Sequence, residues 1–302
     1  MSKIVSIVVL NYKNYHDTID CIDSIFQCKY INLNVIVVDN DSKNESVDIL
    51  KKKYQNKIIL IASKTNLGYA GGNNIGIRKA IELKSDYICV INNDTIVEKN
   101  FIERCISALD SDKNIGIVSP IVLEYNSDVI QSTGGKIFLN KGGSELINKG
   151  KNIKEITKDQ ECDFISGACM FFRKEMIDIN GFLPESYFLF YEETEWCYKI
   201  KKKGFLIKSI CSTFIQHKGS ATIDSISGLS AYLLRRNRVV FVKRNASTFK
   251  YLYFLCYLLI ETLYYKFVKK RNCKGYLKSY WHGMMNIVDL KNYPFILINK
   301  KG

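Results

Sequence analysis

The chain has 302 residues, a length that suits one large domain or one domain with an appendage. Hydrophobic residues make up 47% of it and charged residues 25%, which excludes a wholly disordered protein because there is ample apolar surface to bury. No apolar run reaches about 18 residues, so the sequence predicts no membrane-spanning helix.

The net charge of +14 is concentrated at the C-terminal end of the chain. Residues 235–302 contain 15 Lys and Arg against two acids, Glu261 and Asp289, whereas residues 1–234 are nearly neutral. A uniformly basic chain would indicate nucleic-acid binding. A neutral body with a basic tail instead predicts a body that carries out chemistry and a tail that contacts an anionic surface.

The ten cysteines are scattered, with no Cys-x-x-Cys pair, and several lie in apolar runs. Cysteine in such runs behaves as a small hydrophobic residue, which predicts a reduced, cytoplasmic chain. The apolar run at residues 4–10 is short for a secretory signal, and no small-residue cleavage site follows it.

The first 125 residues alternate between two patterns. Apolar strands are expected near residues 4–10, 35–38, 57–62, 87–91 and 115–118, and amphipathic helices near 16–26, 45–54, 75–83 and 101–109. Continuous apolar strands alternating with helices predict an α/β fold with a parallel sheet covered on both faces. The glycine-rich segment 66–74 is expected to form a turn before the helix at 75.

Polar clusters follow the predicted strands at the edge where their carboxyl ends meet. They are Asn11-Tyr12, Asp39-Asn40-Asp41, residues 66–74 and Asn92-Asn93-Asp94. Open sheets of this class bind ligands in the crevice beyond these strand ends, so the sequence predicts a ligand site there.

The remainder of the chain divides into three parts. Residues 126–160 are expected to form loops and short antiparallel strands, and residues 161–217 return to a strong pattern that includes an aromatic strip at 187–191. Helices are expected at 229–242, 249–268 and 276–288. The predicted organisation is a catalytic domain at 1–226, with halves 1–125 and 126–226, and a basic, aromatic helical region at 227–302.

Two aspartates stand at strand ends. A carboxylate at Asp94 can hold a divalent cation that grips a diphosphate, and the ordinary alternative is a strand-ending turn. A carboxylate at Asp39 can accept a hydrogen bond from a base or a ribose, and its alternative is an Asx turn or a helix cap. The glycine run that contains Gly68 and Gly71 lacks the Lys-Ser/Thr of a P-loop. It is expected either to present amides at a helix N-terminus or to allow close packing of a helix on the sheet.

Three acids, Glu192, Glu193 and Glu195, open a helix directly after the aromatic strip. Acids favour the first turn of a helix because of its dipole. Aromatic walls and neighbouring carboxylates also raise a carboxyl pKa, as a general base requires. His217 follows a strand, and as a metal ligand its imidazole would favour Mn²⁺ over Mg²⁺.

The order of these motifs is more specific than any one of them. They run Asn11-Tyr12, Asp39-Asn40-Asp41-Ser42, residues 66–74, Asn92-Asn93-Asp94-Thr95, Gly167-Ala168, Gly181-Phe182, residues 191–197 and His217-x-Gly-Ser. In sequence and spacing, roughly residues 3–240 resemble the family 2 glycosyltransferases of the GT-A fold, and more narrowly their bacterial rhamnosyltransferase-like subset. The resemblance implies a Rossmann-like, mostly parallel sheet with flanking helices, followed here by a helical, membrane-associating tail.

The resemblance also implies residue roles. Asp39 would bind the nucleotide, Asp94 and His217 would hold Mn²⁺ or Mg²⁺, and Glu193 would be the base, with Glu192 and Glu195 as alternatives. The remaining residues implied in binding the donor or acceptor are Asn11, Tyr12, Asn66, Gly68, Gly71, Asn74, Asn92, Asn93, Gly167, Ala168 and Arg236. Asn92 stands where the family has the first Asp of Asp-x-Asp, and Glu193 stands where it has a shorter Asp.

The implied reaction is an inverting sugar transfer from a nucleoside-diphosphate donor, in the first instance dTDP-rhamnose. UDP-hexose, UDP-N-acetylhexosamine and galactofuranose donors are alternatives. The acceptor would be a polyprenyl-diphosphate-linked or oligosaccharide intermediate of a bacterial surface polysaccharide. A nicotinamide dehydrogenase would need a glycine fingerprint after the first strand, where Asn11-Tyr12 stands. The other rival classes are an inactive scaffold and a nucleic-acid-binding module, which would leave the polar clusters at the strand ends unexplained.

The tail sequence predicts where in the cell the protein lies. Residues 251–260 are apolar but too short to span a bilayer, and tyrosines and lysines surround them. This pattern predicts an interfacial helix on an anionic membrane surface, and hence a cytoplasmic protein peripheral to the inner face of the plasma membrane. The alternatives are packing on the catalytic domain and a homodimer through the C-terminal helices.

Overall fold

The computed structural model describes residues 3–219 and 228–290. The chain divides into two compact units, the first made of residues 1–136, 146–185 and 192–219, and the second of 137–145, 186–191 and 220–302. The boundary expected between residues 226 and 227 lies outside the described residues.

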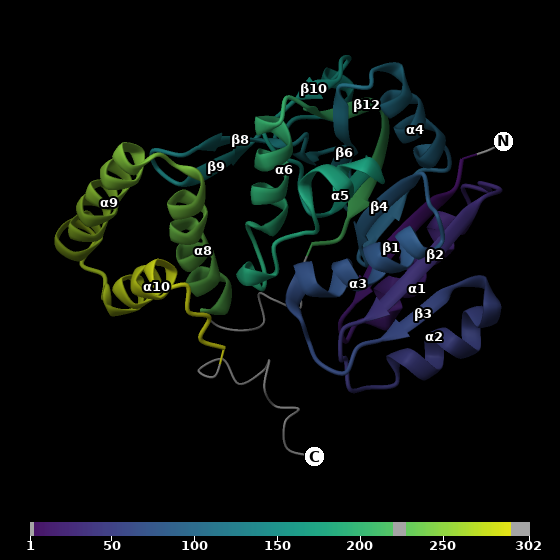
Figure 1. Cartoon of the computed structure of the whole chain (residues 1–302), viewed down its shortest axis with the longest axis horizontal. Coiled ribbons are helices and arrows are strands. Elements are labelled where there is room, and N and C mark those ends of the chain that lie inside the picture. Colours follow the sequence, from purple (N-terminus) through teal and green to yellow (C-terminus); the bar gives the residue numbers. More distant parts are fainter. Residues whose placement is uncertain (1–2, 220–227, 291–302) are drawn as a thin grey trace. The chain divides into compact units, whose positions relative to one another are not determined.

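The first unit is built on a mixed sheet (Figure 1). Its main strands are β1 (Val5–Asn11), β2 (Leu33–Asp39), β3 (Ile59–Ala62), β4 (Tyr87–Asn92), β6 (Ile115–Glu124), β10 (Gln160–Glu161), β11 (Cys169–Arg173) and β12 (Leu206–His217), in the order β10-β12-β6-β11-β4-β1-β2-β3. The short strands β5 (Thr95–Val97) and β7 (Ile130–Ser132) pair with β12 and β6. The pairs among β1, β2, β3 and β4 are parallel, which confirms the α/β prediction for the first half.

The second half of the sheet differs from a continuous parallel series. The expected strand near 115–118 is β6, but β11, which comes some 50 residues later in the chain, lies between β4 and β6 and is antiparallel to both. The long strand β12 pairs with β6 along its length, with a register shift between Ile210 and Phe214. A β-bulge of this kind bends a strand and lets it continue along a twisted neighbour.

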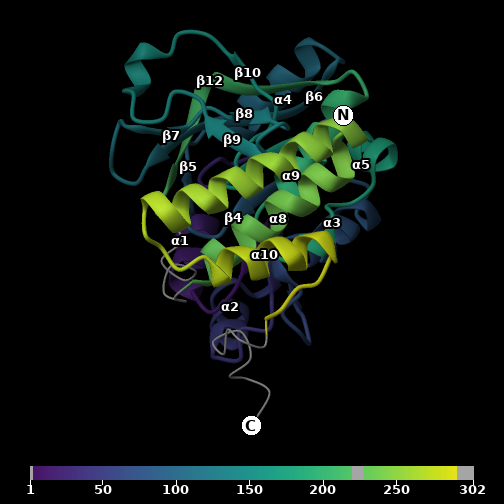
Figure 2. The ribbon, with the colours of Figure 1, turned by 90° about the vertical axis from the view of Figure 1, so that its left-hand side faces the viewer.

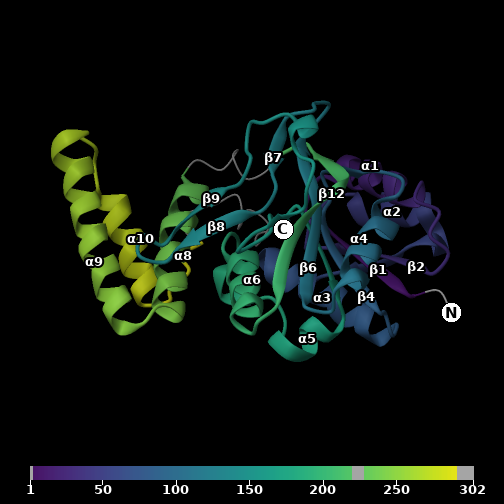
Figure 3. The ribbon, with the colours of Figure 1, turned by 90° about the horizontal axis from the view of Figure 1, so that it is seen from above.

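Helices cover both faces of the sheet, as the apolar strands require. The helices of the first unit are α1 (Tyr15–Phe26), α2 (Ser46–Tyr54), α3 (Gly68–Glu82), α4 (Phe101–Ser111), α5 (Glu175–Asn180) and α6 (Glu192–Lys202). Alternate residues of β1, such as Ile7 and Val9, join a core with α1, α2 and α4, whereas Val8 on the other face meets α3 (Figure 3).

The glycine-rich segment forms the beginning of a helix, which corrects one expectation. Helix α3 starts at Gly68 rather than near residue 75, so Gly71 and Gly72 are helical. A Cβ on Gly72 would collide with Leu10, and one on Gly76 would collide with Val8. The glycines therefore let α3 approach the sheet closely, which was the structural alternative for this run.

The second unit contains α8 (Leu229–Asn245), α9 (Thr248–Leu263), a π-helical turn (Tyr264–Val268) and α10 (Lys274–Met284), which cluster in Figures 2 and 3. The three helices expected in the tail are thus confirmed with shifted ends. The unit also holds residues 137–145 from the hairpin of β8 (Gly135–Phe138) and β9 (Gly143–Leu146). Within the described ranges, no helix is both long and apolar enough to cross a membrane.

A partly buried ion pair joins the three helices of the second unit. The guanidinium of Arg238 on α8 donates to Glu261 Oε2 on α9 at 3.0 Å, and the hydroxyl of Tyr280 on α10 donates to the same oxygen at 3.0 Å. Glu261, the single acid inside the apolar tail segment, therefore has a packing role. Gly283 also contributes to this packing, because a Cβ there would lie 2.6 Å from the carbonyl oxygen of Arg236, so the glycine lets α10 cross α8 closely.

Candidate functional site

The Asp39 carboxylate is held at the end of β2 by its neighbours. Asn11 donates from Nδ2 to Asp39 Oδ2 at 2.6 Å, Ser42 donates from Oγ to the same oxygen at 2.6 Å, and the amide of Ser42 donates to Oδ1 at 3.0 Å. Asn11 is oriented in turn by Thr18, whose hydroxyl donates to its Oδ1 at 2.7 Å. Asp39 and Asn11 are buried, so the Asx-type turn considered for Asp39 is present, and its nucleotide-binding role stays a prediction.

The residues before α3 form a second ordered loop. Asn66 Oδ1 accepts hydrogen bonds from the amide of Gly68 at 2.9 Å and from Asn40 Nδ2 at 3.0 Å. Tyr12, which follows β1, is partly buried beneath the ammonium group of Lys13 at 5.2 Å. These contacts preorganise the strand-end loops that were predicted to bind the donor.

Asn74 and Asn93 lie in hydrogen-bond networks that organise the backbone. Asn74 is buried, donating to the carbonyl of Leu183 at 2.9 Å and accepting from its amide at 3.1 Å. Asn93 donates to the carbonyl of Asn14 at 3.1 Å and to Thr18 Oγ1 at 2.9 Å. Both contact sets are structural, so a direct donor contact by either residue stays a prediction.

Asp94 and His217 meet at the rim of the sheet, although 123 positions separate them in the sequence. His217 Nε2 lies 3.1 Å from Asp94 Oδ1 and 3.3 Å from Asn92 Nδ2. The pairing of β12 with β5 sets His217 opposite Thr95, the residue after Asp94, which explains this meeting. The Asp94 side chain is only 12% exposed and that of His217 only 11%.

Gln131, which sequence reasoning missed, orients the His217 ring. Its Oε1 lies 2.7 Å from His217 Nδ1, so Gln131 contacts one ring nitrogen while Nε2, the other, faces the Asp94 carboxylate. An oriented imidazole and a carboxylate that converge in this way fit two ligands of one divalent cation.

In the part of the chain that the structure describes, no group of three or more His, Cys, Asp or Glu residues could hold a metal. A cation at Asp94 and His217 would therefore take its remaining ligands from water and from a diphosphate, the usual coordination of a metal bound with a nucleotide.

Tyr69, Gly167 and Glu193 form a group beside this rim. The Tyr69 hydroxyl donates to the carbonyl of Gly167 at 2.6 Å, and a Cβ built on Gly167 would lie 3.2 Å from Tyr69 Oη and 3.9 Å from Glu193 Cγ. The next residue, Ala168, accepts a hydrogen bond from the amide of Asn92 at 3.0 Å. One short peptide segment thus connects the Asp94 rim with Glu193.

The three acids of α6 have different surroundings. Glu195 is fully buried, and its carboxylate pairs with Lys199 at 3.0 Å one helical turn later. Glu192 is also buried, whereas Glu193 remains partly accessible. Burial raises the pKa of Glu193, and hydrogen bonds from its own amide and from Thr194 partly oppose that rise. A raised pKa in an accessible carboxyl group is what a general base requires.

Arg236 and Asn237 lie inside the second unit. The Arg236 guanidinium is fully buried and donates to the carbonyls of Ser186 and Ile287 at 2.8 and 3.0 Å. Asn237 Nδ2 donates to the carbonyls of Leu189 and Phe190 at 2.7 and 2.8 Å. These contacts stabilise residues 186–191, in which three non-glycine residues have φ near +70°. The part that Arg236 was expected to take in binding the donor or acceptor stays a prediction.

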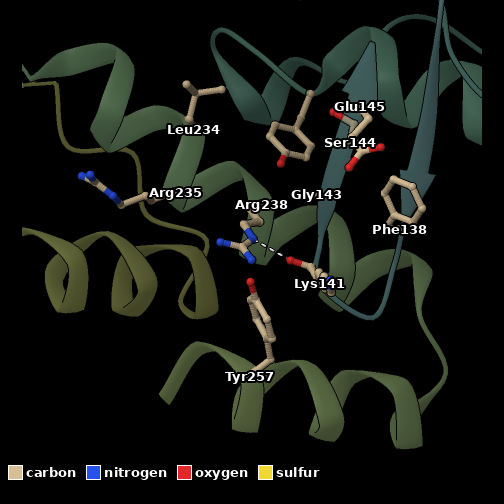
Figure 4. A pocket seen from close by; sticks show the side chains of 10 residues that line it. Phe138, Lys141, Gly143, Ser144, Glu145, Leu234, Arg235, Arg238 and Tyr257 are labelled. Atoms are coloured by element: carbon tan, nitrogen blue, oxygen red, sulfur yellow. Dashed lines mark hydrogen bonds between the residues drawn. The ribbon is translucent and has the colours of Figure 1, made fainter. Parts of the chain in front are cut away.

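A pocket of about 410 Å³ lies within the second unit (Figure 4). Arg238 lines this pocket and donates a hydrogen bond to the carbonyl of Lys141 at 2.7 Å, which is the dashed line in the figure. The pocket is lined by Phe138, Lys141, Gly143, Ser144, Glu145, Tyr191, Leu234, Arg235, Arg238 and Tyr257. None of these residues belongs to the predicted donor site.

Solved structures with low sequence identity share the fold. A mannosyltransferase from Pyrobaculum calidifontis, solved with GDP-Man and Mn²⁺, superposes with a TM-score of 0.59 at 12% identity, covering 100% of this chain and 89% of its own. GalNAc-T7, solved with UDP, GalNAc and Mn²⁺, gives 0.64 at 14% identity and covers 97% and 56%. The α/β sheet is therefore of the GT-A type.

Curated relatives give closer matches in sequence. The low-salt glycan biosynthesis hexosyltransferase Agl10 of Haloferax volcanii is 30% identical over 207 residues, covering 67% of this chain and 63% of the relative. This chain thus spans less than two thirds of that relative's length. The dTDP-rhamnosyl transferase RfbF of Shigella flexneri is 26% identical over 226 residues, 74% and 72% of the two chains. An N-acetylglucosaminyl-diphospho-decaprenol L-rhamnosyltransferase of Mycobacterium tuberculosis is 21% identical over 221 residues, 66% and 72%.

The family itself follows from a family model that matches more than half of the chain. The model of "Glycosyl transferase family 2" matches residues 6–179, which is more than half of the chain and includes Asp39, Asp94 and Gly167. Together with the sheet topology and the strand-end residues, this match shows that the chain belongs to glycosyl transferase family 2.

Proposed function

We propose that the protein is an inverting glycosyltransferase that moves a sugar from a nucleoside-diphosphate donor to an acceptor hydroxyl. The observation that carries the proposal is the connection, through Gly167 and Ala168, of Glu193 with the Asp94–His217 rim. Inversion needs one base on the acceptor side and a charge-stabilising group on the leaving-group side. This connection supplies candidates for both.

Glu193 would accept the proton of the acceptor hydroxyl while that oxygen attacks the anomeric carbon. Its raised pKa makes it a better base than an ordinary carboxylate, and its partial exposure leaves it accessible to an acceptor. The position of Glu193 at the start of α6 also orients its carboxylate, because Thr194 and the amide of Glu193 itself donate hydrogen bonds to it. Glu192 and Glu195, both buried, are the less favoured candidates.

Asp94 and His217 would hold Mn²⁺ or Mg²⁺, and a bound cation would supply Lewis-acid stabilisation of the negative charge that develops on the leaving diphosphate. The chain's own contribution is orientation. Gln131 would accept the Nδ1 proton and so leave Nε2 for the cation, and the backbone of β12 positions the ring. Asp39 and the loop around Asn66 would bind the nucleoside, since they end adjacent parallel strands at the same edge.

We propose dTDP-rhamnose as the first donor to test, since two of the relatives are named as rhamnosyltransferases. UDP-hexose, UDP-N-acetylhexosamine and furanose donors are the alternatives. We further propose a polyprenyl-diphosphate-linked or oligosaccharide acceptor at the inner face of the plasma membrane. The decaprenol-linked substrate in the name of one relative and the basic tail of this chain support that acceptor class.

The test is a donor panel in two stages. Thermal shifts are measured with dTDP-, UDP- and GDP-sugars, each with and without Mn²⁺, and the stabilising donors are then tested for sugar transfer to lipid-linked acceptors. We expect one nucleotide class to raise Tm more strongly with Mn²⁺ than without it. A chain that binds no nucleotide sugar would refute the proposal, and one that binds but never turns over would favour an inactive scaffold.

A further inference from the structure

Helix α9 presents an apolar stripe to solvent along its whole length. Phe249 is 81% exposed, Ile260 65% and Phe267 67%. The stripe follows the helical spacing of three and four residues and continues into the π-helical turn, which keeps it on one face. We call it the outer stripe; its members are Phe249, Leu252, Tyr253, Leu259, Ile260, Leu263, Tyr264 and Phe267.

The opposite face of α9 already has a packing role. Phe254, Leu258 and Thr262 are buried in the second unit, and Glu261 pairs with Arg238. The core therefore explains only one side of a helix that is apolar on two sides. Exposed apolar patches of this extent mark sites of interaction with a protein or a membrane.

Helix α10 extends the exposed apolar surface. Leu277 is 57% exposed and Trp281 56%. Both also line a groove of about 560 Å³ between α9 and α10, together with Leu259 of the outer stripe. Figure 2 shows α9 and α10 lying on the same side of the second unit. The stripe, the groove and the exposed face of α10 are therefore one continuous surface.

The charge around this surface selects its partner. Residues 249–289 contain seven Lys and Arg and two acids. Glu261 is paired with Arg238, and Asp289 is paired with Lys278, which leaves six of the basic residues in excess. Two copies of such a surface would bring like charges together and repel each other. Anionic headgroups would instead neutralise the basic side chains while the acyl region takes up the apolar ones.

We propose that the outer stripe and the exposed face of α10 lie in the interface of an anionic lipid bilayer. The stripe spans 19 residues, roughly 28 Å, and would lie in the membrane plane rather than cross it. This inference deepens the proposed function, because it assigns the surface that would bring the enzyme to a lipid-linked acceptor. It also favours the membrane over the homodimer, one of the alternatives considered for these helices.

The two tryptophans of the chain provide the first test. Trp281 lies on α10 at 56% exposure, whereas Trp196 is 1% exposed in the first unit. Vesicles of phosphatidylcholine and phosphatidylglycerol with dibrominated acyl chains should quench Trp281 and leave Trp196 emitting. The Trp281→Phe variant should lose the quenchable component but still bind. Absence of quenching in the wild-type chain at saturating lipid would overturn the proposal.

Substitutions on the outer stripe provide the second test. The double variant Ile260→Glu with Phe267→Glu should bind these vesicles at least about 100-fold more weakly, because two apolar side chains no longer enter the interface. Neutralising Lys269 or Lys270 should weaken binding about fivefold each, an effect that salt diminishes. Ile31→Glu, at an 89% exposed position in the first unit, is the matched control and should bind normally.

The outcomes separate the alternatives. Equal binding by the double variant and the control overturns the proposal. The proposal is also overturned if the wild-type chain binds no vesicles but forms a dimer in sedimentation equilibrium, and if the double variant abolishes that dimer. A second copy of the chain would then cover the stripe. Thermal shift with the donor panel is measured on the same proteins. A wild-type chain that binds vesicles but no nucleotide sugar would refute the proposed function while leaving the membrane surface intact.

Discussion

The Glu193→Gln variant separates a catalytic role of Glu193 from a structural one. A catalytic role predicts lower turnover without loss of stability, whereas a structural role predicts lower stability. Glutamine keeps the shape of the side chain and its contact with Thr194 but cannot accept the acceptor proton. Turnover should fall by about 10² to 10⁴, which corresponds to roughly 3–5 kcal/mol in the activation barrier. Donor binding, measured as the thermal shift produced by the nucleotide sugar, should be unchanged.

The stability of the same variant should increase at neutral pH. Burial raises the pKa of Glu193 in the folded chain above its ordinary value. A carboxyl group with a raised folded-state pKa contributes its full stability below the unfolded-state pKa and loses it as pH rises through the folded-state pKa. Glutamine carries no charge to desolvate, so its Tm should exceed that of the wild type above this range, and the difference should shrink in acid.

The pH profile adds a third readout. In the wild type, kcat/KM should fall as pH decreases through the raised pKa of Glu193, because the protonated acid is no longer a base. The residual activity of the variant should lack that limb. Glu195→Gln is the comparison, since it removes the ion pair with Lys199 and should mainly lower Tm. Unchanged turnover in Glu193→Gln would exclude Glu193 as the base and direct attention to Glu192.

Three further predictions concern positioning and packing. Gln131→Met should weaken Mn²⁺ binding by about 10- to 100-fold in calorimetry, because His217 loses the hydrogen-bond partner that positions its ring; equal affinity would contradict this role. Gly76→Ala should lower the unfolding free energy by about 1–3 kcal/mol in urea titration, because its Cβ would collide with the sheet, whereas Gly143→Ala, with open space around it, should change little. Asn237→Ala should cost about 1–3 kcal/mol, because carbonyls of residues 187–190 lose their donor; a neutral effect in the same titration would argue against that role.

Local patterns in the sequence were sufficient for much of the first unit. Apolar runs of β-branched residues predicted β1, β2, β3 and β4, and helical spacing predicted α1, α2 and α4. These elements follow from burial alone, because a strand covered on both faces must be apolar along its length. The polar residues that end the strands were predictable for the same reason, and they marked the edge where Asp39 and Asp94 lie.

The glycine run shows where local reasoning stops. Glycines in sequence indicate a turn, but here they are helical because α3 must approach Val8 and Leu10 closely. The sequence of α3 alone does not predict how closely this helix packs on the sheet. Tyr69 lies in the same run, but the sequence did not predict its contact with the Gly167 carbonyl. That contact depends on β11, a strand that begins 100 residues later.

The sequence by itself determined the α/β class, the family motifs and the uneven charge, because each is a property of composition or of spacing within a short segment. Only the tertiary structure decided which distant residues meet. The insertion of β11 between β4 and β6 connects Gly167 to the Asp94 rim. The pairing of β12 with β5 brings His217 to that rim, and the pairing of β7 with β6 holds the strand that carries Gln131. The same holds for α9: both of its faces are apolar in sequence, and only packing determines which is buried and which is left for a partner.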